Sequence, residues 1–260
     1  MSELNRAEKL MKSIIVKAGI ETLKYFGKIG VKYTKADEND VVTEADLKSN
    51  RIIVSAIRKN FPNHGIISEE QKDHDAKADY VWIIDPLDGT LNYSKDTPIY
   101  GVSIALTYKK DVVVASIYLP YFKELYFARK GKGAYLNGKR IRCSNVKKYV
   151  HSMGIIGSIW SRKKNILHNS LIEHSGYGSV WVSSFGSAVF TLCLISSGRR
   201  DWTILQNHHI WDIAAGYLIM REAGCIVTKL DGSEWDLECD NMVAANPKLH
   251  KELLKITKKL

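Results

Sequence analysis

The densest group of acidic residues follows an apolar stretch, WIIDPLDGT at residues 82–90. The run of large apolar residues predicts a buried strand that ends in two acids three positions apart, Asp85 and Asp88. The proline between them cannot continue a strand ladder, and Gly89 lets the backbone approach a ligand closely. A short helix opening at Thr90 would direct free N–H groups at an anion. We therefore expect an anion-binding site at this strand end.

Two carboxylates beside a bound phosphate would repel both the phosphate and each other, so such a site needs a divalent cation. Ligands that are all oxygen atoms favour magnesium or manganese over zinc. A second acidic pair, Glu69 and Glu70, follows the apolar stretch GIIS at residues 65–68. The residues alone leave two alternatives open: a surface turn at residues 85–90, and a solvated acidic pair at residues 69–70.

Four segments, in order along the chain, resemble the motifs of one family. Residues 82–93, WIIDPLDGTLNY, closely resemble the signature of the inositol monophosphatase family, which belongs to the lithium-sensitive, magnesium-dependent phosphatases. Three further segments resemble its early acidic segment, its glutamate motif and its second signature: DVVTEAD at 40–46, SEE at 68–70 and WDIAAG at 211–216. The resemblance implies a layered αβαβα sandwich of the inositol monophosphatase and fructose-1,6-bisphosphatase type, and a homodimer.

The resemblance also implies a role for each matching residue. Two or three magnesium ions, or manganese ions, would be bound by Glu69, Asp85, the Leu87 carbonyl, Asp88 and Asp212. The residues implied to be catalytic are Asp46, Glu69 and Thr90. Substrate contacts are implied for Asp88, Gly89, Thr90, Gly186, Ser187, Ala188 and Asp212, and Lys35 matches the lysine of a mobile loop.

The implied reaction is hydrolysis of a phosphate ester by metal-activated water. Glu69 and Thr90 would place the water beside one magnesium ion, and a second ion would hold the leaving oxygen. Positioning and charge stabilisation dominate phosphoryl transfer, so acids and cations suffice without a Ser-His-Asp triad. Asp212 would reach the site from the second half of the chain; the alternative is that it only caps the helix that it opens.

The alcohol part of the substrate is less well defined. Inositol-specific members carry an acid seven positions before the signature aspartate, which hydrogen-bonds the ring hydroxyls, and Leu205 occupies that position here. A leucine cannot make this bond, although the polar residues 206–209, including His208 and His209, would substitute if the register shifts. We expect a small phosphorylated alcohol similar to inositol monophosphate. Fructose 1,6-bisphosphate, histidinol phosphate and 3′(2′),5′-bisphosphate nucleotides are the alternatives.

The elements that must position these residues follow from the apolar periodicity. Helices are predicted at 2–18, 44–60, 186–195, 211–223 and 247–259. Strands are predicted at 65–68, 80–84, 100–108, 112–118, 125–128, 155–157, 180–183, 226–228 and 242–244. The polar stretch 31–42 is predicted to be an exposed loop.

The order of these elements indicates an α/β protein with two halves. Consecutive strands in the first half favour an antiparallel sheet, whereas strands and helices alternate after about residue 145. We expect an N-terminal α+β half, residues 1–145, with the main metal-binding motifs. A C-terminal α/β half, residues 146–260, would contribute Asp212 and substrate contacts.

Composition narrows the class of protein. The 260 residues include 38 Lys and Arg against 28 Asp and Glu, a net charge of +10, and 45% are hydrophobic, which excludes a disordered chain. No apolar run approaches the roughly 18 residues that cross a membrane, and the charged N-terminus does not resemble a secretory signal, so we expect a cytoplasmic protein. The scattered basic residues are typical of a solvated surface that attracts small anions. A basic protein associated with nucleic acid, with a secondary phosphatase site, is the alternative of another class.

Overall fold

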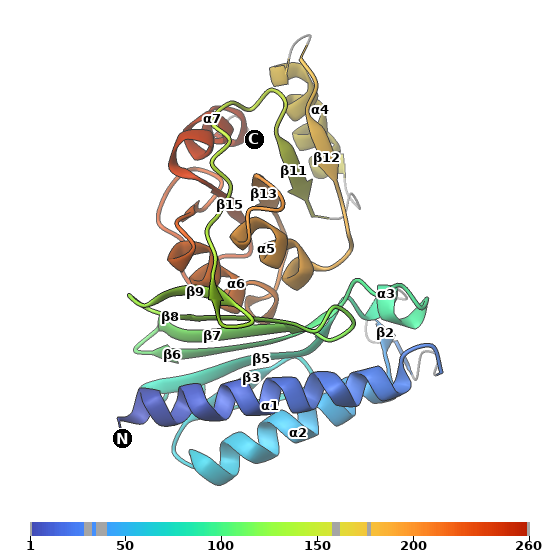
Figure 1. Ribbon diagram of the computed structural model, residues 1–260, viewed down its shortest axis with the longest axis vertical. Coiled ribbons are helices and arrows are strands. Elements are labelled where there is room, and N and C mark those ends of the chain that lie inside the picture. The colour runs from blue at the N-terminus through green and yellow to red at the C-terminus, as the bar shows by residue number, and fades with distance from the viewer. Residues whose placement is uncertain (1, 29–32, 35–40, 158–161, 176–177, 259–260) are drawn as a thin grey trace.

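The computed structural model describes residues 2–28, 33–34, 41–157, 162–175 and 178–258. Helices and sheets alternate in five layers, from the α1 and α2 pair at one end to α4 and α7 at the other (Figure 1). The αβαβα sandwich and the α/β class predicted from the sequence are confirmed. Among the described residues, no helix is both long and apolar enough to cross a membrane.

The first layer consists of helices α1 (Glu3–Tyr25) and α2 (Glu44–Asn60). Helix α1 continues past the predicted end at residue 18, because small and polar side chains extend its buried face. Gly19 leaves room for the ring of Tyr118, and the Thr22 hydroxyl donates a hydrogen bond to the Gly19 carbonyl at 2.8 Å. Apolar periodicity cannot detect a helix face built from such residues.

The second layer is a sheet of eight strands in the order β10-β9-β8-β7-β6-β5-β3-β4. The strands are β3 (Gly65–Ser68), β4 (Gln71–His74), β5 (Tyr80–Asp88), β6 (Gly101–Tyr108), β7 (Asp111–Leu119), β8 (Glu124–Arg129), β9 (Gly133–Leu136) and β10 (Lys139–Arg140). The expected antiparallel pairing holds except between β3 and β5, which run parallel. The acidic ends of these two strands therefore meet at the same edge of the sheet.

The predicted loop at residues 31–42 is wrong in part, because the structure forms two short strands there. Strands β1 (Tyr33–Thr34) and β2 (Val41–Val42) pair with each other in an antiparallel sheet. Residues 35–40, and with them Lys35, lie outside the described residues.

The predicted end of β5 at residue 84 is also wrong, because the strand continues to Asp88. Its register with β6 shifts between Asp85, which pairs with Ser103, and Asp88, which pairs with Gly101. Pro86 lies within the shift and has no N–H group for the ladder. Both acids thus belong to an irregular strand end that β6 supports.

The outer sheet of the second half has the order β12-β11-β13-β15-β14. Its strands are β11 (Met153–Ile156), β12 (Trp181–Ser183), β13 (Trp202–Leu205), β14 (Ile226–Thr228) and β15 (Met242–Ala245). The short helix α3 (Thr90–Ser94) connects β5 to β6 of the first sheet. The helices that follow the first sheet are α4 (Arg162–Ser175), α5 (Ala188–Ser196), α6 (Ile210–Glu222) and α7 (Pro247–Thr257). The sequence pattern does not predict α4, whose residues are largely polar, or β13, whose four residues are all buried and show no alternation.

Helices α5 and α6 form the middle layer between the two sheets (Figure 1). Side chains from both helices contribute to the apolar core on each side, so these helices are apolar nearly all round. Gly216 of α6 packs against Leu192 of α5, where a Cβ atom would lie 2.2 Å from a leucine methyl carbon. This close packing holds the N-terminal ends of α5 and α6 over the end of β5.

Candidate active site

Three aspartates from distant parts of the sequence converge at the end of β5. Asp85, Asp88 and Asp212 each present a carboxylate oxygen, and these oxygens lie within 4.8 Å of one another. Asp85 and Asp88 belong to β5, and Asp212 lies in the first turn of α6. Asp85 is buried, and its carboxylate accepts a hydrogen bond from the Leu87 N–H at 3.0 Å. The sequence prediction that these acids share one location is consistent with this geometry.

The electrostatics of the cluster are those of a cation site. Burial, followed by the charges of Glu69, Asp88 and Asp212, raises the pKa of Asp85 well above its usual value. Burial and the neighbouring Asp212 raise the pKa of Asp88 to about 7. A divalent cation would remove this repulsion, and carboxylate oxygens are the ligands that magnesium prefers. The residues present therefore fit a magnesium ion.

Glu69 belongs to the same electrostatic environment, although it is not one of the three acids that share the 4.8 Å cluster. It directly follows β3, and its N–H donates to the Ile84 carbonyl of β5 at 3.3 Å. Its charge raises the pKa of both Asp85 and Asp88. The strand pairing thus places Glu69 beside the cluster.

Asp46 and Thr90 form a hydrogen-bonded pair next to the aspartate cluster. The Thr90 hydroxyl lies 3.1 Å from Asp46 Oδ1 and 2.8 Å from the Leu87 carbonyl oxygen. Thr43, which caps α2, donates to Asp46 Oδ2 from its N–H at 2.8 Å and from its hydroxyl at 2.5 Å. Burial raises the pKa of Asp46 to about 6. Thr43 is not among the site residues predicted from the sequence, although a threonine three positions before an acid is the pattern of a capping box.

Gly89 connects β5 to α3 in a backbone conformation that only glycine adopts readily. Its φ is +84°, and a Cβ atom would lie 2.7 Å from the Ile99 carbonyl oxygen. Asn92, in α3, donates to the carbonyls of Ile99 at 3.0 Å and Phe185 at 2.7 Å. Asn92 therefore ties the first motif to the segment that contains Gly186.

The substrate-contact turn predicted at residues 186–188 lies directly against Asp88. The Ser187 hydroxyl donates to Asp88 Oδ2, and the N–H groups of Ala188 and Val189 lie 3.3 and 3.1 Å from its two oxygens. Ser187 also caps α5 by accepting a hydrogen bond from the Phe190 N–H at 3.1 Å. A carboxylate at a helix N-terminus is favoured by the helix dipole. Asp88 thus belongs to the aspartate cluster and also accepts the hydrogen bonds that join β5 to the start of α5.

A small cavity of about 110 Å³ opens beside Asp88. Its lining residues are Asp88, Ile156, Gly157, Phe185, Gly186, Ser187, Ala188, Thr191, Leu205 and His208. Leu205 is buried and lines this cavity, so the position that carries an acid in inositol-specific members presents an apolar wall here. His209 is not among the lining residues; its ring stacks on Trp211 with 4.6 Å between ring centres.

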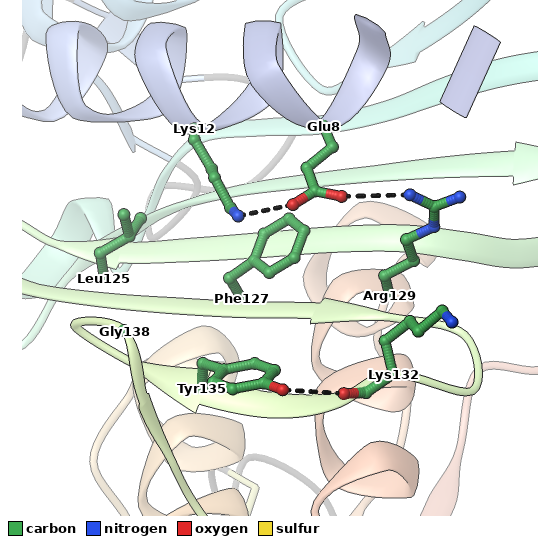
Figure 2. Close-up of a pocket in the computed structure, with 8 residues that line it drawn as sticks. All are labelled: Glu8, Lys12, Leu125, Phe127, Arg129, Lys132, Tyr135 and Gly138. Carbon is green, nitrogen blue, oxygen red and sulfur yellow. Dashed lines mark hydrogen bonds and ion pairs between the residues drawn. The ribbon is translucent and has the colours of Figure 1, made fainter. Parts of the chain in front are cut away.

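A larger surface cavity of about 580 Å³ lies between α1 and the strands β8 and β9 (Figure 2). Glu8 forms ion pairs with Lys12 at 2.7 Å and with Arg129 at 3.4 Å. The Lys12 ammonium also lies 3.8 Å from the centre of the Phe127 ring. None of the site residues predicted from the sequence lines this cavity, where one acid, Glu8, faces the three cations Lys12, Arg129 and Lys132.

A cluster of three aspartates between the two sheets of an αβαβα sandwich, with ligands that fit a divalent cation, is the arrangement expected of a metal-dependent phosphatase. The chain matches the model of the inositol monophosphatase family over residues 4–260. It therefore belongs to the inositol monophosphatase family.

Proteins similar to this chain include SuhB proteins and a fructose-1,6-bisphosphatase/inositol-1-monophosphatase. The chain is 40% identical over 227 residues to the putative Nus factor SuhB of Neisseria meningitidis serogroup B, with 84% of each protein covered. It is 34% identical over 245 residues to the fructose-1,6-bisphosphatase/inositol-1-monophosphatase of Aquifex aeolicus, covering 93% of this chain and 92% of that protein. The crystal structure of the extragenic suppressor protein SuhB of Bartonella henselae superposes with a TM-score of 0.91 at 29% identity, covering 98% of this chain and 99% of the other.

Proposed function

We propose that this protein is a magnesium-dependent phosphomonoesterase that hydrolyses a small phosphorylated alcohol, similar to inositol monophosphate, by means of metal-activated water. The observation that carries the proposal is the convergence of Asp85, Asp88 and Asp212 within 4.8 Å at the junction of the two halves. The name of the Aquifex aeolicus relative supports the same reaction class.

The metal ligands in this proposal are Glu69, Asp85, the Leu87 carbonyl, Asp88 and Asp212, which would hold two or three magnesium ions, or manganese ions. When bound, magnesium supplies positive charge that activates water and stabilises the phosphoryl group in the transition state. The raised pKa values of Asp85 and Asp88 support the assignment, because a bound cation would offset both the burial and the repulsion between carboxylates that raise them.

Asp46, Glu69 and Thr90 would orient the attacking water. The Thr90 hydroxyl lies within hydrogen-bond distance of both Asp46 and the Leu87 carbonyl, so it can be held in a fixed direction. Asp46 is in turn held by two hydrogen bonds from Thr43. Such rigid support favours positioning of a nucleophile, which is the main protein contribution to phosphoryl transfer.

The phosphate and the alcohol would occupy the two sides of Asp88. On one side the N–H groups of Gly89 and Thr90 would face the phosphate. On the other side the turn at 186–188 and the small cavity would receive the alcohol. Millimolar lithium would inhibit by competing for a magnesium position, as expected for this family.

The substrate itself is tested by a panel of phosphate esters. We would measure kcat/KM with magnesium for inositol 1-phosphate, fructose 1,6-bisphosphate, histidinol phosphate, phosphoadenosine phosphate and glycerol 2-phosphate. The proposal predicts release of phosphate, with the highest kcat/KM for a monophosphate such as inositol 1-phosphate. A preference for one of the other esters would reassign the substrate within the superfamily, and no release from any ester would contradict the proposal.

We also propose a homodimer. Tyr121 and Phe122 expose 52% and 44% of their surface in the turn between β7 and β8. The Phe122 ring contacts Phe190 of α5, and the Tyr121 ring contacts Phe26 after α1. A contiguous exposed aromatic surface of this kind supports association with a second copy of the chain.

A second candidate function is association with nucleic acid, favoured by the relatives named Nus factor and by the net charge of +10. The cavity in Figure 2 combines Lys12, Arg129 and Lys132 with the rings of Phe127 and Tyr135. Cations with aromatic rings suit single-stranded nucleic acid. Fluorescence anisotropy with a single-stranded RNA tests this candidate: Lys132→Glu should weaken specific binding more than Lys24→Glu, and binding that vanishes in moderate salt without sequence preference would indicate nonspecific charge alone.

A further inference from the structure

His208 lies against Asp212 of α6, which is one of the proposed metal ligands. Its Nδ1 atom lies 3.3 Å from Asp212 Oδ2, and its backbone N–H donates to the Asp240 carbonyl at 2.9 Å. Asn207, just before it, adopts a positive φ of 55°, which turns the chain into the start of α6. Two contacts therefore fix the position of the His208 imidazole.

The contact with Asp212 determines which imidazole nitrogen carries the proton. Asp212 Oδ2 also accepts a hydrogen bond from the His209 N–H at 2.8 Å. Because this carboxylate oxygen acts as a hydrogen-bond acceptor, Nδ1 of His208 is assigned as the donor in the contact. In the neutral ring, Nε2 then has a free lone pair and accepts hydrogen bonds.

The Nε2 atom has no hydrogen-bond partner among the described residues, and it is shielded from solvent. Such an unpaired buried polar atom is rare in folded proteins. His208 lines the small cavity beside Asp88, together with Leu205 and Gly157. A Cβ atom at Gly157 would lie 3.2 Å from Nε2, so the glycine leaves space beside this nitrogen that a side chain would fill.

We propose that His208 is a specificity-determining residue whose Nε2 atom accepts a hydrogen bond from a hydroxyl group of the substrate alcohol. Leu205 cannot accept such a bond, and the imidazole lies on the wall of the same cavity. The substrate class is then a phosphorylated alcohol that carries at least one further hydroxyl group. This inference rests on the proposed phosphatase function, because it assigns the alcohol side of the same site.

The inference predicts a change in substrate preference. His208→Leu removes the acceptor, and Gly157→Ala places a methyl group 3.2 Å from Nε2, where it blocks the approach of a hydroxyl group while the imidazole itself is retained. Each variant should lower kcat/KM for inositol 1-phosphate about tenfold relative to phenyl phosphate, which has no further hydroxyl group. His208→Gln, which retains an acceptor, should restore part of the preference, and His209→Leu is the matched control that should leave it unchanged.

A purely structural role would give a different result. If His208 only positioned Asp212, its replacement would raise the magnesium concentration needed for half-maximal rate and would slow both esters equally. An unchanged ratio between the two esters in His208→Leu and Gly157→Ala, with the wild type active, would overturn this inference alone. A wild type that releases phosphate from neither ester would instead overturn the proposed function and the inference with it.

The protonation pattern gives a readout that does not depend on activity. A long-range ¹H–¹⁵N spectrum of the imidazoles, assigned with His208→Gln, should show His208 with its proton on Nδ1. Inositol 1-phosphate, added with calcium to allow binding without rapid turnover, should shift the Nε2 resonance. A proton on Nε2 in the free protein would contradict the proposed acceptor.

Discussion

The carboxylate of Asp88, at the end of β5, accepts a hydrogen bond from the N–H of Val189 at 3.1 Å, across 101 positions of the sequence. The same oxygen accepts a hydrogen bond from the hydroxyl group of Ser187, the N-cap residue of α5. One side chain thus joins the first sheet to the middle helical layer and also faces Asp85 and Asp212. The acidic cluster can form only when the two halves are docked.

A replacement at Asp88 can distinguish the need for its negative charge from the need for its hydrogen bonds to the start of α5. Asp88→Asn keeps one acceptor oxygen for Val189 but removes the negative charge, so turnover should fall by about 10²- to 10⁴-fold while the fold is retained. Steady-state kinetics over a magnesium titration, together with circular dichroism, would check this. The exposed Asp73→Asn is the control; near-native activity of Asp88→Asn would reject the ligand assignment.

Loss of the Thr90 hydroxyl group should lower kcat more than loss of the Thr90 methyl group. Thr90→Val removes the group that lies 3.1 Å from Asp46 and should lower kcat about 100-fold, whereas Thr90→Ser should stay within a few-fold of the wild type. Single-turnover rates at saturating substrate would measure the effect on the chemical step. Equal loss in both variants would show that packing, and not the hydroxyl, is required.

His250 should make stability depend on pH. Burial lowers its pKa from 6.5 to about 4, and its Nε2 lies 2.9 Å from the Thr228 hydroxyl. Because the unfolded chain binds the proton first, the stabilisation is complete above pH 6.5 and is lost as the pH falls toward about 4.

Urea unfolding at two pH values would measure this effect. Between about pH 7 and pH 5, the wild type should lose about 1 to 2 kcal/mol more than His250→Gln, which has no titrating group at this position. The comparison between the two proteins cancels the contribution of the buried carboxylates. The same loss in both proteins would mean that His250 is protonated as easily in the folded state as in the unfolded one.

The exposed aromatic surface should be the dimer interface. Phe122→Asp places a charge where the ring is 44% exposed and should convert a dimer into a monomer. Light scattering after size-exclusion chromatography would give the molar mass. Ile172→Asp, on the equally exposed face of α4, should remain dimeric, and a monomeric wild type would contradict the proposed homodimer.

The acidic motif could be predicted from the sequence because its signal is local. An apolar run followed by Asp85, Asp88 and Gly89 already indicates a strand end with charge and a flexible turn. The apolar pattern predicts an end of β5 that is too early, because the register shift around Pro86 depends on pairing with β6, which lies elsewhere in the sequence. Register irregularities of this kind come from tertiary contacts.

Other parts of the site could not be derived from local patterns. The bonds from Ser187 and Val189 to Asp88 depend on how the two halves dock. Strand β13 spans only Trp202–Leu205, and its burial on both sides erases any alternation. The family resemblance identified Leu205 as a departure, but only the structure shows that His208 lines the same cavity.

The most direct test of the central claim is the dependence of phosphate release on magnesium. Purified protein would be assayed with inositol 1-phosphate after removal of metal by a chelator, and then with added magnesium. We predict no release with chelator, full recovery with magnesium, and no recovery in Asp88→Asn. Release that persists in the chelator, or that Asp88→Asn retains, would contradict a reaction centred on Asp85, Asp88 and Asp212.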